Sequence, residues 1–179
     1  KDGVSKSKVA MAMMNLQETE NETNSNTTKV LQSKFVLKKL PVDIEYQSSS
    51  EIKLKENPKF GVEKLEWSPN SRFLAFVNDN MAKYVWIWDM KCLCLHSVLK
   101  HLSPVLQLLW TGNEHSSNQL ASCCNQRDQL YLWNKKGAVV IRVLASRFVV
   151  RQMYAQPNNE CICLVDNGHF CCCYDFNFE

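Results

Sequence analysis

The chain has 179 residues, with 21 Lys and Arg against 18 Asp and Glu, so its formal net charge is only +3. A charge so close to balance provides no strong field for nucleic acid or an anionic membrane surface, and we expect neither as a partner. The longest apolar run, residues 9–14, is far shorter than the roughly 18 residues of a membrane-spanning helix, so the sequence predicts a folded protein without a membrane span.

The first 61 residues differ in composition from the rest. Residues 1–29 are rich in Asn, Thr, Glu, Ser and Lys, which predicts a disordered polar tail. Residues 30–40 (VLQSKFVLKKL) are apolar and β-prone and predict one strand, followed by a polar linker up to residue 61. No secretory signal is visible at Lys1, and we expect the chain to be part of a longer protein, with this strand as the outer strand of a preceding unit.

From residue 62 onward the sequence repeats with a period of about 43 residues. Short apolar runs alternate with turn text such as SPN, NDN, NQRD, KKG and DNG, which predicts strands rather than helices. Each unit carries one aromatic residue at the end of its first run and another just before an Asp or Asn. These markers are Trp67, Trp110 and Tyr154 for the first run, and Trp88 with Asp89, Trp133 and Tyr174 for the second position.

This period, with four short strands and a Trp-Asp pair at the end of the third, is typical of a WD-repeat β-propeller blade. The predicted fold is therefore all-β, a partial WD-repeat propeller whose three blades are 62–99, 105–144 and 148–177. The expected strands are 62–67, 73–77, 84–89 and 92–99, then 105–110, 119–124, 129–134 and 138–144, then 148–154, 160–165 and 169–175. The third blade lacks a fourth strand, and its open edge needs a partner from elsewhere in a longer propeller.

Several stretches resemble one family more closely than generic repeat text. They are NPKFGVEKLEWSPN, NDNMAKYVWIWDM, the LSPV before the second blade, QLYLWNKKG and LVDNGHFCCCYDF. Over residues 57–177 the chain resembles the C-terminal blades of the WD-repeat protein eight family, the centrosomal and spindle-pole WD-repeat proteins encoded antisense to the p73 tumour-protein gene.

The resemblance implies a function that composition and spacing do not. It implies a non-enzymatic scaffold of the cytoplasm and cytoskeleton, at the centrosome and spindle pole, that acts in microtubule minus-end anchoring, spindle assembly and ciliogenesis. The implied partners are a coiled-coil centriolar-satellite or spindle-anchoring protein and γ-tubulin or minus-end kinesin complexes. The alternative is a generic WD-repeat adaptor of another complex, in RNA processing or ubiquitin ligation.

One blade carries the residues of a supporting hydrogen-bond network that is common in this fold. Such a network runs from a strand-three Trp through Ser or Thr to His and Asp, and its candidates in the middle unit are Trp133, Ser122, His101 and Asp128. His101 has no nucleophile beside it, so we expect structural support rather than catalysis. We expect Trp133 to be a core residue.

The nine cysteines stand mostly in adjacent or alternate positions, where neighbouring side chains on a strand point to opposite faces. This spacing favours free, buried thiols in a reducing compartment over disulfides or a zinc site. The sequence also contains no phosphate-binding glycine loop, metalloprotease helix or nucleophile elbow. We therefore expect no cofactor, no metal and no enzymatic activity.

The loops that join strand two to strand three, and strand four to the next blade, are the expected protein contacts. The basic residues elsewhere are dispersed among acidic ones and predict a solvated surface. The candidate contact residues in these loops are Asn78, Asp79, Lys83, Lys100, His101, Arg127, Arg147 and His169.

Overall fold

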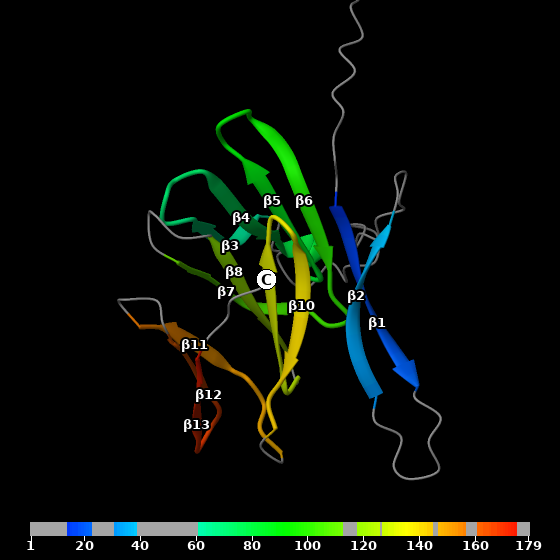
Figure 1. Cartoon of the computed structure of the whole chain (residues 1–179), viewed down its shortest axis with the longest axis vertical. Coiled ribbons are helices and arrows are strands. Elements are labelled where there is room, and N and C mark those ends of the chain that lie inside the picture. Colours follow the sequence, from blue (N-terminus) through cyan, green and yellow to red (C-terminus); the bar gives the residue numbers. More distant parts are fainter. Residues whose placement is uncertain are drawn as a thin grey trace, which may run out of the picture.

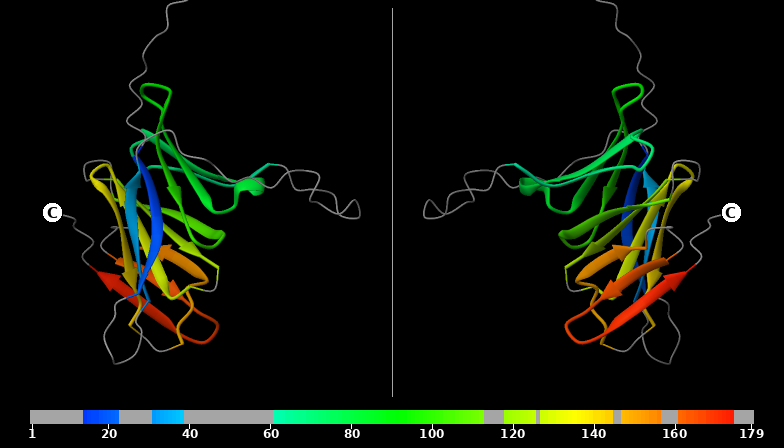
Figure 2. Two further views of the ribbon diagram at one scale, coloured as in Figure 1. Left: turned by 90° about the vertical axis from the view of Figure 1, so that its right-hand side faces the viewer. Right: turned by 90° about the vertical axis from the view of Figure 1, so that its left-hand side faces the viewer.

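The computed structural model of the chain describes residues 14–22, 31–38, 61–112, 118–125, 127–144, 147–156 and 161–174. Within these residues the backbone forms β strands in three sheets and one short 3-10 helix, η2 (Asp79–Met81), which confirms the all-β prediction. No helix in these ranges is long and apolar enough to cross a membrane. Figures 1 and 2 show the three sheets fanned side by side in chain order, as the blades of a propeller are.

Each blade is an antiparallel meander of consecutive strands. The first blade contains β3 (Val62–Trp67), β4 (Phe73–Asn78), β5 (Tyr84–Asp89) and β6 (Cys94–Lys100). The second contains β7 (Val105–Thr111), β8 (Gln119–Cys124), β9 (Gln129–Asn134) and β10 (Gly137–Arg142). The third contains β11 (Gln152–Ala155), β12 (Cys161–Val165) and β13 (Phe170–Tyr174). Most bounds match the strands predicted from the repeat to within two residues, and the third sheet has three strands in the described range.

The middle blade is covered on both faces. Every residue of β8 and β9 is buried, whereas buried and half-buried residues alternate along β4. One apolar cluster fills the space between the first and second blades, and a second cluster fills the space between the second and third. The first includes Phe73, Val85, Ile87, Leu108, Trp110 and Trp133, and the second includes Leu130, Leu132, Phe148, Met153, Ile162 and Leu164.

Aromatic rings join the first two blades. Phe73 lies nearly parallel to Trp110, with ring centroids 6.2 Å apart, and edge-on to Trp133 at 5.8 Å. The indole Nε1 of Trp110 also donates a hydrogen bond of 2.9 Å to the carbonyl oxygen of Glu66 on β3. Because this bond crosses between two sheets, it fixes the inner strand of one blade against the next.

A side chain makes the corresponding connection between the second and third blades. The amide Nε2 of Gln107 donates to the carbonyl of Met153 at 2.8 Å, and the Met153 backbone N–H donates back to Oε1 at 2.7 Å. Gln107 thus makes, with one residue of β11, the two backbone hydrogen bonds that a neighbouring strand would make. Together, the bonds of Trp110 and Gln107 connect the inner strands of all three blades.

Contrary to the prediction of a disordered tail over residues 1–29, residues 14–22 form a strand, β1 (Met14–Glu22). It pairs antiparallel with β2 (Leu31–Lys38) and parallel with β6, so the first sheet has the order β2-β1-β6-β5-β4-β3. The composition argument failed because β1 is held by backbone hydrogen bonds on both sides, which a polar sequence can make as well as an apolar one. The rest of 1–29 lies outside the described residues.

The strand expected within residues 30–40 exists as β2, but it does not belong to a preceding blade. It is the outermost strand of the first blade's own sheet. Figures 1 and 2 show the β1–β2 hairpin beside β10 of the second blade as well, so it spans the outer side of two blades. The expected linker, 39–60, lies outside the described residues.

In the third unit, the residues that face the second blade stand one position before the predicted aromatic markers. Its residues that face the second blade include Met153, Ile162, Leu164 and the half-buried Cys173. The predicted markers Tyr154 and Tyr174 point to the opposite, open face and are 54% and 69% exposed. Because successive strand residues point to opposite faces, a shift of one residue exchanges the two faces.

We predict that Trp133→Ala will lower the free energy of unfolding by about 3 to 5 kcal/mol, because the indole is only 1% exposed and its removal leaves a core cavity. Trp67→Ala is the matched control, since Trp67 is 48% exposed and should change stability by less than about 1 kcal/mol. Urea unfolding followed by circular dichroism measures both. Equal effects of the two substitutions would contradict the stacked-blade core.

Candidate functional site

The expected contact loops lie together at one end of the three blades. In the first two blades the second and fourth strands end at the same side, and in the third blade β12 ends there as well, so the segments that follow these strands meet at that end. We call this end the loop rim and define it by the described residues of 79–83, 101–104, 125–128, 143–151 and 166–169. It is the candidate functional site.

Backbone hydrogen bonds connect the loops of the rim. The N–H groups of His101 and Val105 donate to the carbonyls of Lys83 and Ala82 at 2.9 and 2.8 Å, which joins the first blade to the start of the second. The N–H groups of Val143 and Val150 donate to Asp128 and Arg127 at 2.8 and 3.0 Å and continue the connection toward the third blade. The rim is therefore one connected platform rather than a set of independent loops.

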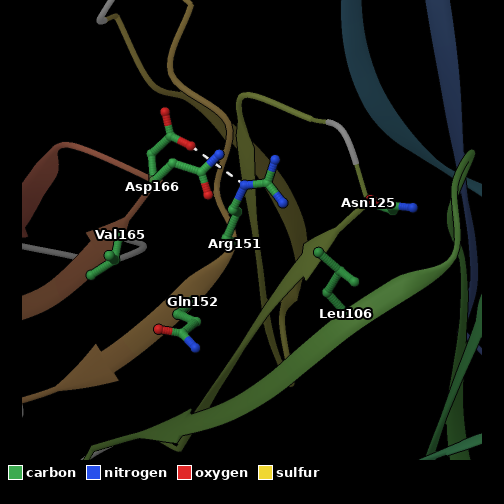
Figure 3. A pocket seen from close by; sticks show the side chains of 7 residues that line it. Leu106, Asn125, Arg151, Gln152, Val165 and Asp166 are labelled. Carbon is green, nitrogen blue, oxygen red and sulfur yellow. Dashed lines mark ion pairs between the residues drawn. The ribbon is translucent and has the colours of Figure 1, made fainter.

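A hollow of about 390 Å³ lies in the rim between the second and third blades. Its lining residues come from both blades and are Leu106, Asn125, Arg151, Gln152, Val165, Asp166 and Asn167. Figure 3 shows Arg151 and Asp166 side by side at its edge, with 3.6 Å between Arg151 Nε and Asp166 Oδ1. The hollow is open and polar, so it is suited to a protruding polar side chain of a partner rather than to a buried small molecule.

Positive side chains dominate the accessible part of the rim. Lys83, Arg147 and Arg151 are exposed, as is His169. Arg147 has a φ of 64°, a left-handed conformation that is uncommon outside glycine. The rim has three acidic residues: Asp79 is half-buried, and Asp128 and Asp166 are each paired with an arginine, Arg142 and Arg151 respectively. An acidic partner surface is electrostatically complementary to this arrangement.

Several predicted contact residues make hydrogen bonds or ring contacts within the protein. Asn78 accepts a hydrogen bond from the Asn80 N–H at 3.2 Å and caps η2, and the backbone N–H of Asp79 donates to Gly61 at 3.0 Å. The Lys100 ammonium lies 5.7 Å from the centre of the Tyr84 ring, and Arg127 Nε donates to Ser103 Oγ at 3.2 Å. Lys83, Arg147 and His169 are exposed as expected.

The prediction that His101 contacts a partner is wrong, because its side chain is buried beneath the rim and only 1% exposed. Its ring lies edge-on to Tyr131 and Phe35, with centroids 4.7 and 5.4 Å away. Burial lowers the pKa of His101 to about 3, so the imidazole is neutral at physiological pH.

The predicted Trp-Ser-His-Asp network does not form in the described structure. Trp133 Nε1 and both ring nitrogens of His101 are buried without a hydrogen-bond partner, and Asp128 instead accepts a 2.8 Å bond from Arg142 Nε. Ser122 is buried as well. The four residues belong to the second blade and the loop that precedes it, but their polar atoms are not connected.

Glu18 of β1 takes over the polar contacts near His101. Its Oε2 accepts a bond from the Leu102 N–H at 3.0 Å, and its Oε1 accepts one from the Tyr131 hydroxyl at 2.9 Å. Oε2 is also 4.0 Å from Nδ1 of His101. Glu18, which is 1% exposed, therefore attaches the β1–β2 hairpin to a rim loop. Sequence reasoning missed it because a single Glu in a polar segment carries no local signal of burial.

The described residues contain no group of His, Cys, Asp or Glu arranged to hold a metal ion. The rim thus presents hydrogen-bond donors, positive charge and an open hollow, which are features common to surfaces that bind proteins. Among the described residues of the rim, no acid, base and nucleophile are arranged together.

Comparisons with known proteins agree with the repeat pattern. No family model matches the sequence. The chain is 33% identical over 144 residues to the WD repeat-containing protein WRAP73 of Mus musculus, a match that covers 80% of this chain. The chain spans about 30% of the length of that curated relative.

Two solved structures are similar to part of this chain at lower identity. A chain of the mitotic checkpoint complex is 21% identical with a TM-score of 0.49, over 64% of this chain and 38% of that one. The β-propeller domain of Cps50 (Swd1) from Myceliophteria thermophila is 20% identical with a TM-score of 0.45, over 63% of this chain and 38% of that one.

We predict that His101→Leu will remove part of the protein's acid sensitivity. The unfolded chain protonates this histidine near pH 6.5, whereas the folded chain does so only near pH 3, so stability contributed by the neutral ring is lost as pH falls below 6.5. Between pH 7 and pH 5 the wild type should lose about 2 kcal/mol more than the variant. Urea unfolding at both pH values measures the difference, and identical losses would mean that His101 is protonated in the folded state.

Proposed function

We propose that this chain, which belongs to the WD-repeat protein family, is a non-enzymatic protein-binding scaffold whose partners contact the loop rim. Its connected backbone supports the proposal, because a preorganised surface loses little conformational entropy on binding. The exposed Lys83, Arg147 and Arg151 and the adjoining hollow supply charge and shape for a specific contact.

The cellular context we propose is the centrosome and spindle pole. The observation that carries this proposal is the family text at residues 57–177, together with the 33% identity to WD repeat-containing protein WRAP73 over most of the chain. The scaffold then acts in microtubule minus-end anchoring, spindle assembly and ciliogenesis. Its proposed partners are a coiled-coil satellite or spindle-anchoring protein and γ-tubulin or minus-end kinesin complexes.

An affinity capture of the tagged protein from dividing cells, combined with imaging of the tag, tests this context. We expect a coiled-coil satellite protein with γ-tubulin or a minus-end kinesin, and a focus at spindle poles. Capture of RNA-processing or ubiquitin-ligase subunits, together with a diffuse or nuclear signal, would overturn the centrosomal function. It would instead indicate that the protein is a WD-repeat adaptor of another complex.

The double substitution Lys83→Glu and Arg147→Glu should lower capture of the partner about tenfold, because it reverses exposed charge at the rim. The matched control is Lys91→Glu with Lys136→Glu, which makes the same charge change in the β5–β6 and β9–β10 turns at the opposite end of the blades. Capture by each variant is quantified against the wild type, with a thermal melt to verify folding. A loss that is equal in both variants would move the partner site away from the rim.

A further inference from the structure

Two cysteines meet at the turn between β5 and β6, far from the loop rim. The Sγ atoms of Cys92 and Cys94 are 2.8 Å apart, on residues separated by Leu93 alone. Cys92 is exposed and Cys94 is half-buried. The turn stands at the upper edge of the view in Figure 1 and is open to solvent.

The turn is held in place by a buried acid. The carboxylate of Asp89, which is 3% exposed, accepts bonds from Arg72 Nε and Nη2 at 3.0 and 2.8 Å and from the Lys91 N–H at 3.0 Å. The carbonyl of Asp89 also lies 3.7 Å from Cys92 Sγ and accepts its thiol hydrogen bond. The backbone on the N-terminal side of the two thiols is therefore fixed by the folded blade.

Leu93 adopts a backbone conformation that packing does not explain. Its φ is 51°, in the left-handed region that a branched side chain such as leucine rarely occupies, and its side chain is 70% exposed. Strained residues of this kind concentrate at functional sites, because the surrounding fold imposes the conformation for another purpose. Here the conformation turns the side chains of positions 92 and 94 toward one another.

We propose that Cys92 and Cys94 form a reversible dithiol–disulfide couple that is oxidised by glutathione disulfide. The bonded sulfur separation is about 2.05 Å, so ring closure shortens the observed contact by less than about 1 Å. The bonds from Asp89 hold the turn on the N-terminal side of the two thiols.

The exchange proceeds in two balanced steps. The Cys92 thiolate attacks one sulfur of glutathione disulfide, so that a Cys92–glutathione bond forms, the glutathione S–S bond breaks and one glutathione thiolate leaves. Cys94 gives its proton to water and attacks the Cys92 sulfur, which expels the second glutathione thiolate. The protein loses two electrons, the two glutathiones gain them, and the two protons released reach the leaving thiolates through solvent.

Cys92 is the attacking thiol because it is the more exposed of the two. The pKa of Cys94 lies above its ordinary value, chiefly because of its hydrogen bond to Cys92, so Cys94 forms the attacking thiolate less readily than an ordinary cysteine does.

The adjacent pair Cys123 and Cys124 is the internal comparison. Both thiols are fully buried on β8, and burial raises the pKa of Cys123 to about 12. A neutral, inaccessible thiol does not attack a disulfide, so these two cysteines should stay reduced under the same conditions.

The test equilibrates the folded protein in glutathione buffers of increasing oxidised fraction, alkylates free thiols and digests with trypsin. Cleavage after Lys91 and Lys100 isolates residues 92–100, which contain both cysteines and no others, and cleavage after Lys100 and Arg127 isolates Cys123 with Cys124. We expect the 92–100 fragment to lose two hydrogens and resist alkylation while the other fragment is alkylated. In the folded protein, half of the Cys92–Cys94 pair should be a disulfide at a ratio of oxidised to reduced glutathione about tenfold lower than a synthetic peptide of residues 92–100 requires. The reason is that the folded turn preorganises the two thiols.

Cys94→Ser provides the matched variant, since it should stop the reaction at the Cys92–glutathione adduct. The proposal would be overturned by half-closure at the same buffer ratio as the free peptide, or by glutathione adducts on both cysteines without ring closure. Closure only in samples whose Cys123 and Cys124 have also reacted would equally overturn it, because the unfolded chain would then be the reactant.

Discussion

A β-sheet with apolar side chains on both faces is stable only when something covers each face, and this constraint organises the whole molecule. The middle blade meets it completely, since every residue of β8 and β9 is buried between its two neighbours. Trp110 and Gln107 then add polar bonds across the two interfaces. The first and third blades are covered by the middle blade on one face alone, which leaves Trp67 and Tyr174 about half or more exposed on their open faces.

The same stacking builds the loop rim. When neighbouring sheets pack face to face, the ends of their strands come close enough for the loop of one blade to bond to the backbone of the next. Val105 and Val150 donate their N–H groups across these boundaries, to Ala82 and Arg127 respectively. The loop rim, our proposed protein-binding surface, is thus a consequence of how the blades cover one another, and it places Lys83, Arg147 and Arg151 on a common platform.

The β1–β2 hairpin adds a second kind of covering. It extends the first blade beyond β6 and lies against the second blade, where Glu18 bonds to Leu102 and Tyr131. A buried carboxylate is tolerated there because its oxygens accept hydrogen bonds. Since Leu102 belongs to the rim, the hairpin supports the loop rim through this bond. The redox turn at Cys92 lies at the other end of the first blade, so the two sites are independent.

The sequence by itself determined the strands of the first two blades, because alternating apolar residues and turn text are local properties that recur with the repeat. It also located the loops of the rim and the burial of Trp133, since the repeat places them. It did not determine which face each residue of the third unit occupies, because a shift of one residue reverses the faces and the aromatic markers gave no means of detecting it. Only the tertiary structure decided the pairing of β1 with β6, the burial of Glu18 and the contact between Cys92 and Cys94. These depend on partners distant in sequence or on a left-handed backbone at Leu93, and neither leaves a local pattern.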